Sequence, residues 1–213
     1  LLCNKYYVEL DTDELILCWH LNIDQWLIMV NANTGDILLC EEHIDYAEDV
    51  TTKVYITNPL HSAQVTYGGQ YSDNYDASNT ELNNELVTVV LKNIEYWNGP
   101  IGSPKMISSD YCIVKDIRSP TNSLLMATNG NWDYTRSHDM FEVAMIIYHL
   151  DLAGKRVFDF GYDHFWLRNI EVDPHGMTLD NAAYSPSQNE MYFGDGGVDC
   201  AEDASIIWHE YGH

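Results

Sequence analysis

Residues 206–213 read Ile-Ile-Trp-His-Glu-Tyr-Gly-His, and this stretch decides how the end of the chain folds. Its two histidines, His209 and His213, are four residues apart. On an α-helix that spacing places both imidazoles on one face. Alanine, isoleucine and tryptophan residues between 201 and 208 precede them at helical spacing, which predicts one helix running into the motif.

The start of this helix also has a local signal. Asp199 can serve as the N-cap, and Glu202 lies three residues further on, which is the arrangement of a capping box. No stop signal follows before residue 213. We therefore expect a helix that begins near Asp199 and continues past the end of the sequence, so that the chain is a fragment of a longer protein.

Two imidazoles on one helix face can bind a single Zn²⁺ ion. Glu210 lies about 100° further round the helix, near enough to the metal to hold a water without being a ligand. In such a site zinc lowers the pKa of the water, and Glu210 takes its proton for attack on a peptide carbonyl. A catalytic site uses a third protein ligand, which we expect beyond residue 213. The alternative is an accidental H-E-x-x-H on a surface helix.

The composition limits the other functions open to the chain. Apolar residues make up 46% and aromatic residues 12% of its 213 residues, which is typical of a packed globular protein. Acidic residues outnumber basic ones by 33 to 10, for a net charge of -23. Such a surface repels phosphate backbones and anionic lipids, so we expect no nucleic-acid partner. No stretch is long and apolar enough to span a membrane, so we expect no membrane segment. Five cysteines without a C-x-x-C pair indicate buried free thiols rather than a disulfide framework.

Residues 1–45 are predicted as β structure, because branched and aromatic residues favour strands over 15–23, 26–30 and 37–40. A turn with Gly35 connects the last two of these strands. An acidic connector, 41–49, follows and has no apolar periodicity.

The remaining sequence changes its pattern near residue 136. Short apolar runs separated by turn residues predict a β-rich lobe over 46–135, in which 86–97 is ambiguous between strand and helix. Residues 138–158 are predicted as one amphipathic helix, and 173–198 are predicted mainly as loop. The fold class is therefore α+β, with three parts that span 1–45, 46–135 and 136–213.

The sequence before the histidine motif resembles the thermolysin-like and fungalysin-like zinc peptidases, which are gluzincins. Residues 181–184 read Asn-Ala-Ala-Tyr, and residues 191–197 read Met-Tyr-Phe-Gly-Asp-Gly-Gly. In those families a similar edge strand is followed by a turn, by a strand with a Gly- and Asp-rich end, and by the zinc helix. The resemblance is specific over 138–213 and weak over 50–135. It implies a zincin-like fold whose C-terminal lobe is absent from this sequence.

A second resemblance lies at the other end of the chain. Residues 30–38 read Val-Asn-Ala-Asn-Thr-Gly-Asp-Ile-Leu, which is similar to the hairpin that closes the PepSY-like propeptide domain of these peptidases. The resemblance implies that residues 1–45 are the end of a propeptide that acts as an intramolecular inhibitor. It also implies a secreted, extracellular zymogen, which we expect to be cleaved within 41–53.

Carried over by position, Asn181, Ala182 and Tyr184 would bind an extended polypeptide substrate as an added strand. The alternatives are a turn-forming role for Asn181 and core packing for Tyr184.

The family often has an Asp that helps to hold Ca²⁺ where this chain has Ser205. Nearby acids at 199, 202 and 203 lack EF-hand spacing, so a loop with a helix cap is preferred over a calcium site. His149, His164 and His175 lack paired spacing and are interpreted as polar or surface histidines.

We therefore predict a zinc-dependent metalloendopeptidase, present as an incomplete and inactive fragment. The metal ligands are His209 and His213, and the catalytic base is Glu210. One alternative is a zincin of another class, which the third ligand would distinguish. The other is a degenerate peptidase or pro-domain module that binds or inhibits without catalysis.

Overall fold

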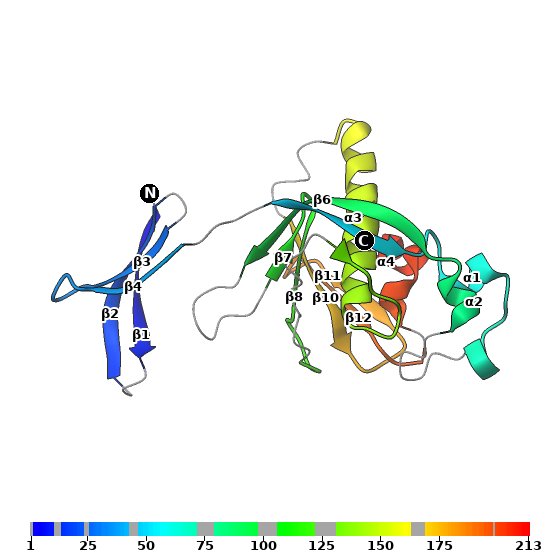
Figure 1. The fold of residues 1–213 in the computed structure, drawn as a ribbon, viewed down its shortest axis with the longest axis horizontal. Coiled ribbons are helices and arrows are strands. Elements are labelled where there is room, and N and C mark those ends of the chain that lie inside the picture. Colours follow the sequence, from blue (N-terminus) through cyan, green and yellow to red (C-terminus); the bar gives the residue numbers. More distant parts are fainter. Residues whose placement is uncertain are drawn as a thin grey trace. The chain divides into compact units, whose positions relative to one another are not determined.

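The computed structural model describes residues 2–10, 14–23, 26–42, 47–71, 79–97, 106–121, 131–162, 169–197 and 199–213. The chain divides into two compact units, Leu1–Tyr46 and Ala47–His213. Strands and helices are mixed along the chain, which confirms the predicted α+β class (Figure 1). Residues 47–213, predicted as a β-rich lobe and a helical part, belong to a single unit.

The first unit is an antiparallel sheet with the strand order β1-β2-β3-β4. Its strands are β1 (Leu2–Leu10), β2 (Glu14–Ile23), β3 (Trp26–Asn31) and β4 (Ile37–Glu42). The predicted turn connects β3 and β4. In that turn the side-chain oxygen of Asn31 accepts hydrogen bonds from the backbone N–H groups of Asn33 and Thr34, at 2.9 and 3.2 Å. Gly35 has φ +80°, a conformation that glycine adopts without strain.

The second unit contains a mixed sheet of eight strands, in the order β11-β12-β10-β8-β7-β6-β5-β9. The pairs β12-β10, β10-β8 and β5-β9 are parallel, and the others are antiparallel. The strands are β5 (Glu48–Val54), β6 (Val87–Trp97), β7 (Met106–Ser108), β8 (Cys112–Lys115), β9 (Asn131–Trp132), β10 (Ile170–Met177), β11 (Ala182–Ser185) and β12 (Glu190–Gly194).

Two predictions about strands need correction. The ambiguous segment 86–97 is a strand, β6, because it pairs with β5 and β7. The segment 173–198 is not mainly loop, since it contains the end of β10 and all of β11 and β12. The polar residues after Val172 can belong to a strand because Asp173 is buried and hydrogen-bonded. Its carboxylate accepts hydrogen bonds from the backbone N–H groups of Ile117 and Arg118, at 2.9 and 2.8 Å.

The acidic connector was also predicted too long, because β4 extends to Glu42 and β5 begins at Glu48. Val50, in β5, is fully buried. Residues 43–46, and residues 122–130 of the predicted β-rich lobe, lie outside the described residues.

The long helix α3 (Met140–Asp159) packs on the sheet, and the last helix of the chain packs on α3 (Figure 1). The predicted helix is confirmed, but it is amphipathic only in its second half. Its first eight residues, 140–147, are all buried, because the sheet covers one side and the C-terminal segment the other. Gly161, with φ +90°, follows its end.

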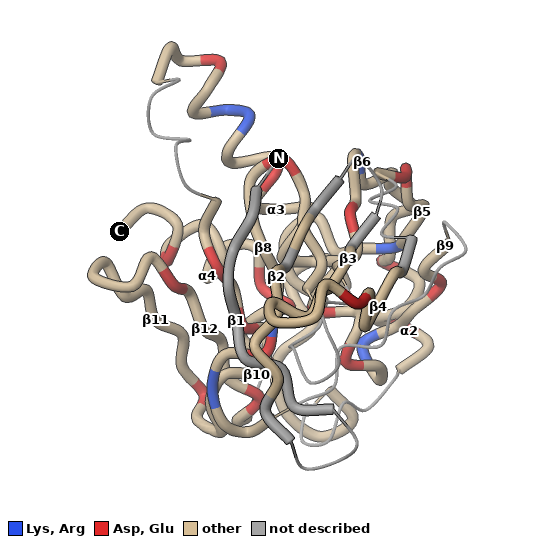
Figure 2. The backbone as a smooth tube through the Cα atoms, turned by 90° about the vertical axis from the view of Figure 1, so that its left-hand side faces the viewer, with Lys and Arg blue, Asp and Glu red and all other residues tan. Residues whose placement is uncertain are grey.

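The described part of this unit also contains short helices and 3₁₀ turns: α1 (Pro59–Ala63), η1 (Gly69–Tyr71), α2 (Thr80–Asn83) and η3 (Cys200–Glu202). The side chains of Asn58 and Asn79 cap α1 and α2. In the described part of the chain, no helix combines the length and apolar character that crossing a membrane requires. Acidic positions outnumber basic ones along the described elements (Figure 2).

Four of the cysteines are described as free thiols. Cys18, Cys112 and Cys200 are buried, as predicted, whereas Cys40 is exposed at the end of the hairpin. The prediction of buried thiols is therefore wrong for Cys40. The side chain of Cys3 lies outside the described part of the structure.

Candidate metal centre

The histidine motif lies on helix α4 (Ala204–Tyr211), which begins later than the capping-box pattern predicts. Its N-cap is Asp203, whose Oδ1 accepts the backbone N–H and the hydroxyl of Ser205, at 2.7 and 2.6 Å. Asp199 instead precedes the 3₁₀ turn η3 and makes no side-chain cap bond. The capping box is wrong because Glu202 is bonded elsewhere, to Arg136.

Helix α4 is held by residues distant in the sequence. The second oxygen of Asp203 accepts a hydrogen bond from the side-chain amide of Asn58, at 2.9 Å. The indole N–H of Trp208 donates to the backbone oxygen of His149 on α3, at 3.1 Å. Ile207 is fully buried on the side that faces the core. These contacts fix the direction in which the motif's side chains project.

The motif brings its two imidazoles together on the exposed side of the helix. The Nε2 atoms of His209 and His213 are 3.1 Å apart. Two nitrogens bonded to one tetrahedral Zn²⁺ at about 2.0–2.1 Å would be about 3.3 Å apart. A carboxylate oxygen of Glu210 lies within 4.8 Å of a ring nitrogen of each histidine. These residues therefore fit a zinc ion, and among the described residues no other His, Cys, Asp or Glu joins the group.

Glu210 differs from the two histidines in its exposure. His209 and His213 are exposed, whereas Glu210 is only 7% exposed and lines a pocket. The difference follows from its place on the helix, about 100° from His209 and about 60° from His213. The carboxylate thus lies beside the two imidazoles and faces the interior of the pocket.

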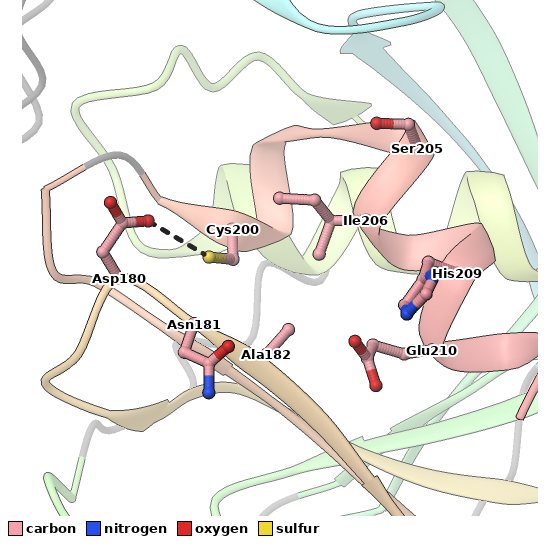
Figure 3. Close-up of a pocket in the computed structure, with 8 residues that line it drawn as sticks. All are labelled: Asp180, Asn181, Ala182, Cys200, Ser205, Ile206, His209 and Glu210. Atoms are coloured by element: carbon pink, nitrogen blue, oxygen red, sulfur yellow. Dashed lines mark hydrogen bonds between the residues drawn. The ribbon is translucent and has the colours of Figure 1, made fainter.

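The pocket has a volume of about 440 Å³ and lies between α4 and the start of β11 (Figure 3). His209 and Glu210 lie at one end, and Asp180 lies at the other. Asn181 and Ala182 form the side that belongs to β11 and the turn before it. Asn181 and Ala182, two of the three residues predicted to bind substrate, therefore line the same pocket as His209 and Glu210.

Tyr184, the third of them, does not line this pocket. Its ring packs against the core, and its hydroxyl donates to Asn189 at 3.2 Å. Strand β11 is the last in the order of the described strands, and its one strand neighbour there is β12.

The acidic group near the motif forms a buried cluster instead of an EF-hand loop. Glu142, Asp199 and Glu202 are at most 4% exposed, and one carboxylate oxygen of each lies within 4.8 Å of the others. Arg136 pairs with Glu202 through two nitrogens, at 3.1 and 2.8 Å. Carboxylate oxygens suit Ca²⁺, but the guanidinium already neutralises part of this charge. The preference for a loop with a helix cap over a calcium site stays a prediction.

Two of the other histidines, predicted to be polar or surface residues, are buried and hydrogen-bonded. His149 is fully buried, and its Nε2 donates to the backbone oxygen of Tyr55 at 2.8 Å; burial lowers its pKa. His175 lies between Asp195, at 2.9 Å, and the backbone oxygen of Asp139, at 3.1 Å. Burial alone lowers the pKa of His175, but these two partners outweigh it and leave the pKa raised. His164 lies outside the described residues.

A second pocket, of about 250 Å³, lies between α3, β6 and the turn before β8. Asp151 lines it and accepts a hydrogen bond from the hydroxyl of Ser109, at 2.5 Å. Burial raises the pKa of Asp151 to about 7, and the charge of Asp110 acts in the same direction. This pocket contains none of the motif residues.

The sequence pattern missed four pocket residues, Asp180, Cys200, Ser205 and Ile206. Asp180 could have been predicted as a pocket residue, because it directly precedes Asn181 in the sequence. Cys200 had no such signal, because η3 brings it to the pocket through a turn that the pattern assigned to the helix.

Comparison with known protein families, with curated proteins and with solved structures finds no match to this chain. The functional interpretation therefore depends on the geometry above and on the motif resemblance.

Proposed function

We propose that this protein is a zinc-dependent endopeptidase of the gluzincin type. The observation that carries the proposal is that the imidazoles of His209 and His213 lie together beside a pocket, and that the start of β11 lines this pocket. The imidazole pair has the separation that one zinc ion needs, and Glu210 lies between that pair and the pocket.

In this proposal His209 and His213 hold the metal through their Nε2 atoms. When bound, the Zn²⁺ ion supplies a Lewis acid that acidifies water and polarises a peptide carbonyl. Glu210 accepts the proton of the attacking water at its carboxylate and passes it to the leaving amine. Its burial beside the pocket keeps it directed toward that water. We propose that a third protein ligand, as such sites require, completes the metal shell.

The substrate backbone is proposed to lie along β11 as an added antiparallel strand. Asn181 is exposed at the start of this strand, where its amide can bond a substrate carbonyl or N–H. Ala182 leaves space beside it, because its side chain is a single methyl group. Tyr184 supports the strand from the core, which fits the packing alternative better than the substrate-wall alternative.

The order of elements adds support. An edge strand, a turn, a second strand, a Gly- and Asp-rich end and a motif helix follow one another from β11 to α4, as the gluzincin resemblance implies. A separate four-stranded unit precedes them. We propose that this unit is the end of the propeptide and inhibits the enzyme until cleavage, in a secreted zymogen.

The test uses Glu210→Gln in the protein expressed from its complete reading frame. The amide keeps the shape of the carboxylate but cannot take a proton, so zinc content should stay equal to that of wild type. Peptide hydrolysis should fall by roughly a hundred- to ten-thousandfold. Glu95→Gln, an exposed change on β6, is the matched control and should keep full activity.

Near wild-type hydrolysis by Glu210→Gln would exclude Glu210 as the base. A wild-type protein that binds no zinc in calorimetric titration would exclude the metal centre itself, and with it the enzyme. Zinc binding without hydrolysis of any peptide would favour the non-catalytic module.

A further inference from the structure

We propose that the pocket beside the motif binds a cationic side chain of the substrate, lysine or arginine, through Asp180. This inference rests on the proposed peptidase function and adds the substrate class. Its basis is the position of Asp180, at the end of the pocket opposite His209 and Glu210 (Figure 3).

The lining of the pocket matches the shape of a long basic side chain. Ala182 and Ile206 lie between the motif residues and Asp180, so the middle of the pocket is apolar (Figure 3). Lysine and arginine bury an apolar stem and keep a charged head at its end. A stem packed on Ala182 and Ile206 would bring that head to the carboxylate of Asp180. The volume of about 440 Å³ lies in the range of pockets that hold small ligands.

The charges of the pocket favour the same substrate. Its described lining has two carboxylates, those of Asp180 and Glu210, and contains neither Lys nor Arg. The thiol of Cys200 donates to Oδ1 of Asp180 at 3.8 Å. Burial and the nearby carboxylate raise the pKa of this thiol to about 11, so it stays a neutral donor at neutral pH. An acidic substrate side chain would therefore be repelled, and a cationic one attracted.

The backbone around Asp180 keeps the carboxylate open. The loop after β12 packs directly on residues 178–181, and a Cβ on Gly196 would come within 2.6 Å of the backbone nitrogen of Asp180. A Cβ on Gly197 would lie 3.0 Å from Oδ2 of Asp180. Glycine at both positions allows the close packing and leaves no side chain over the carboxylate. Asp180 is thus positioned by the fold and remains exposed to the pocket.

The expected effect is moderate, because Asp180 is exposed before substrate binds. An ion pair of this kind contributes up to about 1 kcal/mol, which is roughly a fivefold change in kcat/KM. The preference should weaken at high salt, since exposed charges are screened.

The experiment compares quenched peptides that differ at one position, with Lys, Arg, Leu or Glu placed on either side of the scissile bond. The enzyme is expressed from its complete reading frame. In wild type, the Lys and Arg peptides should have kcat/KM values about fivefold above the Leu peptide at one of the two positions. The Glu peptide should be the poorest substrate.

Asp180→Asn should remove most of this discrimination, and Asp180→Lys should reverse it in favour of Glu. Asp159→Asn removes the same charge from an exposed site at the end of α3, and should keep the wild-type ratios. A binding measurement that needs no turnover uses Glu210→Gln. Its Kd for the Lys peptide should rise about fivefold when Asp180→Asn is added.

The outcomes separate the two proposals. Peptide hydrolysis with equal kcat/KM for Lys, Leu and Glu, or with ratios unchanged in Asp180→Asn, overturns the cationic subsite and leaves the peptidase standing. A wild-type protein that hydrolyses none of the peptides overturns both.

Discussion

The cap of the motif helix gives the most specific stability prediction. Asp203→Ala removes three hydrogen bonds: two from Ser205, at 2.7 and 2.6 Å, and one from Asn58, at 2.9 Å. Loss of an N-cap costs about 1 kcal/mol, and loss of a further hydrogen bond costs about another 1 kcal/mol. Asn58 is also left without its acceptor at a partly buried site. We therefore expect the free energy of unfolding to fall by about 2–3 kcal/mol.

A second variant separates the cap from the link to Asn58. In Asp203→Asn the side-chain oxygen still accepts from Ser205. Its amide nitrogen cannot accept from Asn58, whose own oxygen is already bonded to the backbone N–H of His61 at 2.7 Å. This variant should lose about 1 kcal/mol. Asp139→Ala is the matched control, because Asp139 precedes α3 but makes no side-chain cap bond. It should change the free energy of unfolding by less than about 0.5 kcal/mol.

The assay is urea unfolding followed by tryptophan fluorescence, with hydrogen exchange at the first amides of α4 as a local measurement. Asp203→Ala should also speed exchange at Ser205 and Ile206. A loss equal to that of Asp139→Ala would refute the assignment of the cap. Equal losses for Asp203→Ala and Asp203→Asn would show that the bond to Asn58, and not the cap, carries the effect.

Three further predictions address the site, a buried acid and processing. Asn181→Ala should lower peptide kcat/KM roughly fivefold with zinc content unchanged, since one bond to the substrate backbone is lost; equal values for several peptides would leave Asn181 as a turn residue. Because burial raises the pKa of Asp151 from 3.8 to about 7, the stability it contributes is complete below pH 3.8 and is lost as the pH rises through 7. Relative to wild type, the free energy of unfolding of Asp151→Asn should therefore rise by about 2 kcal/mol between about pH 4 and about pH 8. This is half of what three pKa units represent, because water reaches the pocket. The measurement is urea unfolding of both proteins across this pH range; Asp159→Asn should show no such gain, and parallel stability curves for Asp151→Asn and wild type would contradict the raised pKa. N-terminal sequencing of the secreted, active enzyme should find a start between Glu42 and Glu48, because cleavage further on would remove the buried strand β5; residues 1–39 still attached to active enzyme would exclude this processing.

Local patterns in the sequence were sufficient where short-range geometry decides the structure. The turn between β3 and β4 follows from the Asn and Gly at its corners, whose conformations and side-chain bonds are local. The long helix α3 follows from apolar spacing over 20 residues. The pairing of His209 with His213 follows from the helical repeat alone, which is why the meeting of the two imidazoles could be predicted without a fold.

Predictions failed where a distant partner competes with the local one. Glu202 has the right spacing for a capping box, but it pairs with Arg136, 66 positions away. Strand β10 contains Asp173, Pro174 and Gly176, which read as a turn. It continues to Met177 because β12 pairs with Asp173 and, after a register shift, with Met177. His149 and His175 are buried, and a backbone oxygen of another segment bonds the Nε2 atom of each.

The sequence by itself determined the α+β class of the fold, the long helix and the two imidazoles on one helix face, since each depends on residues within a few turns of one another. Only the tertiary structure decided which acid caps α4, through an amide 145 positions away, and which residues meet the motif in one pocket. Asp180 and Glu210 line the same pocket because β11 pairs with β12 and α4 packs on α3. Such contacts depend on burial and on backbone pairing between distant segments, and no local spacing encodes them.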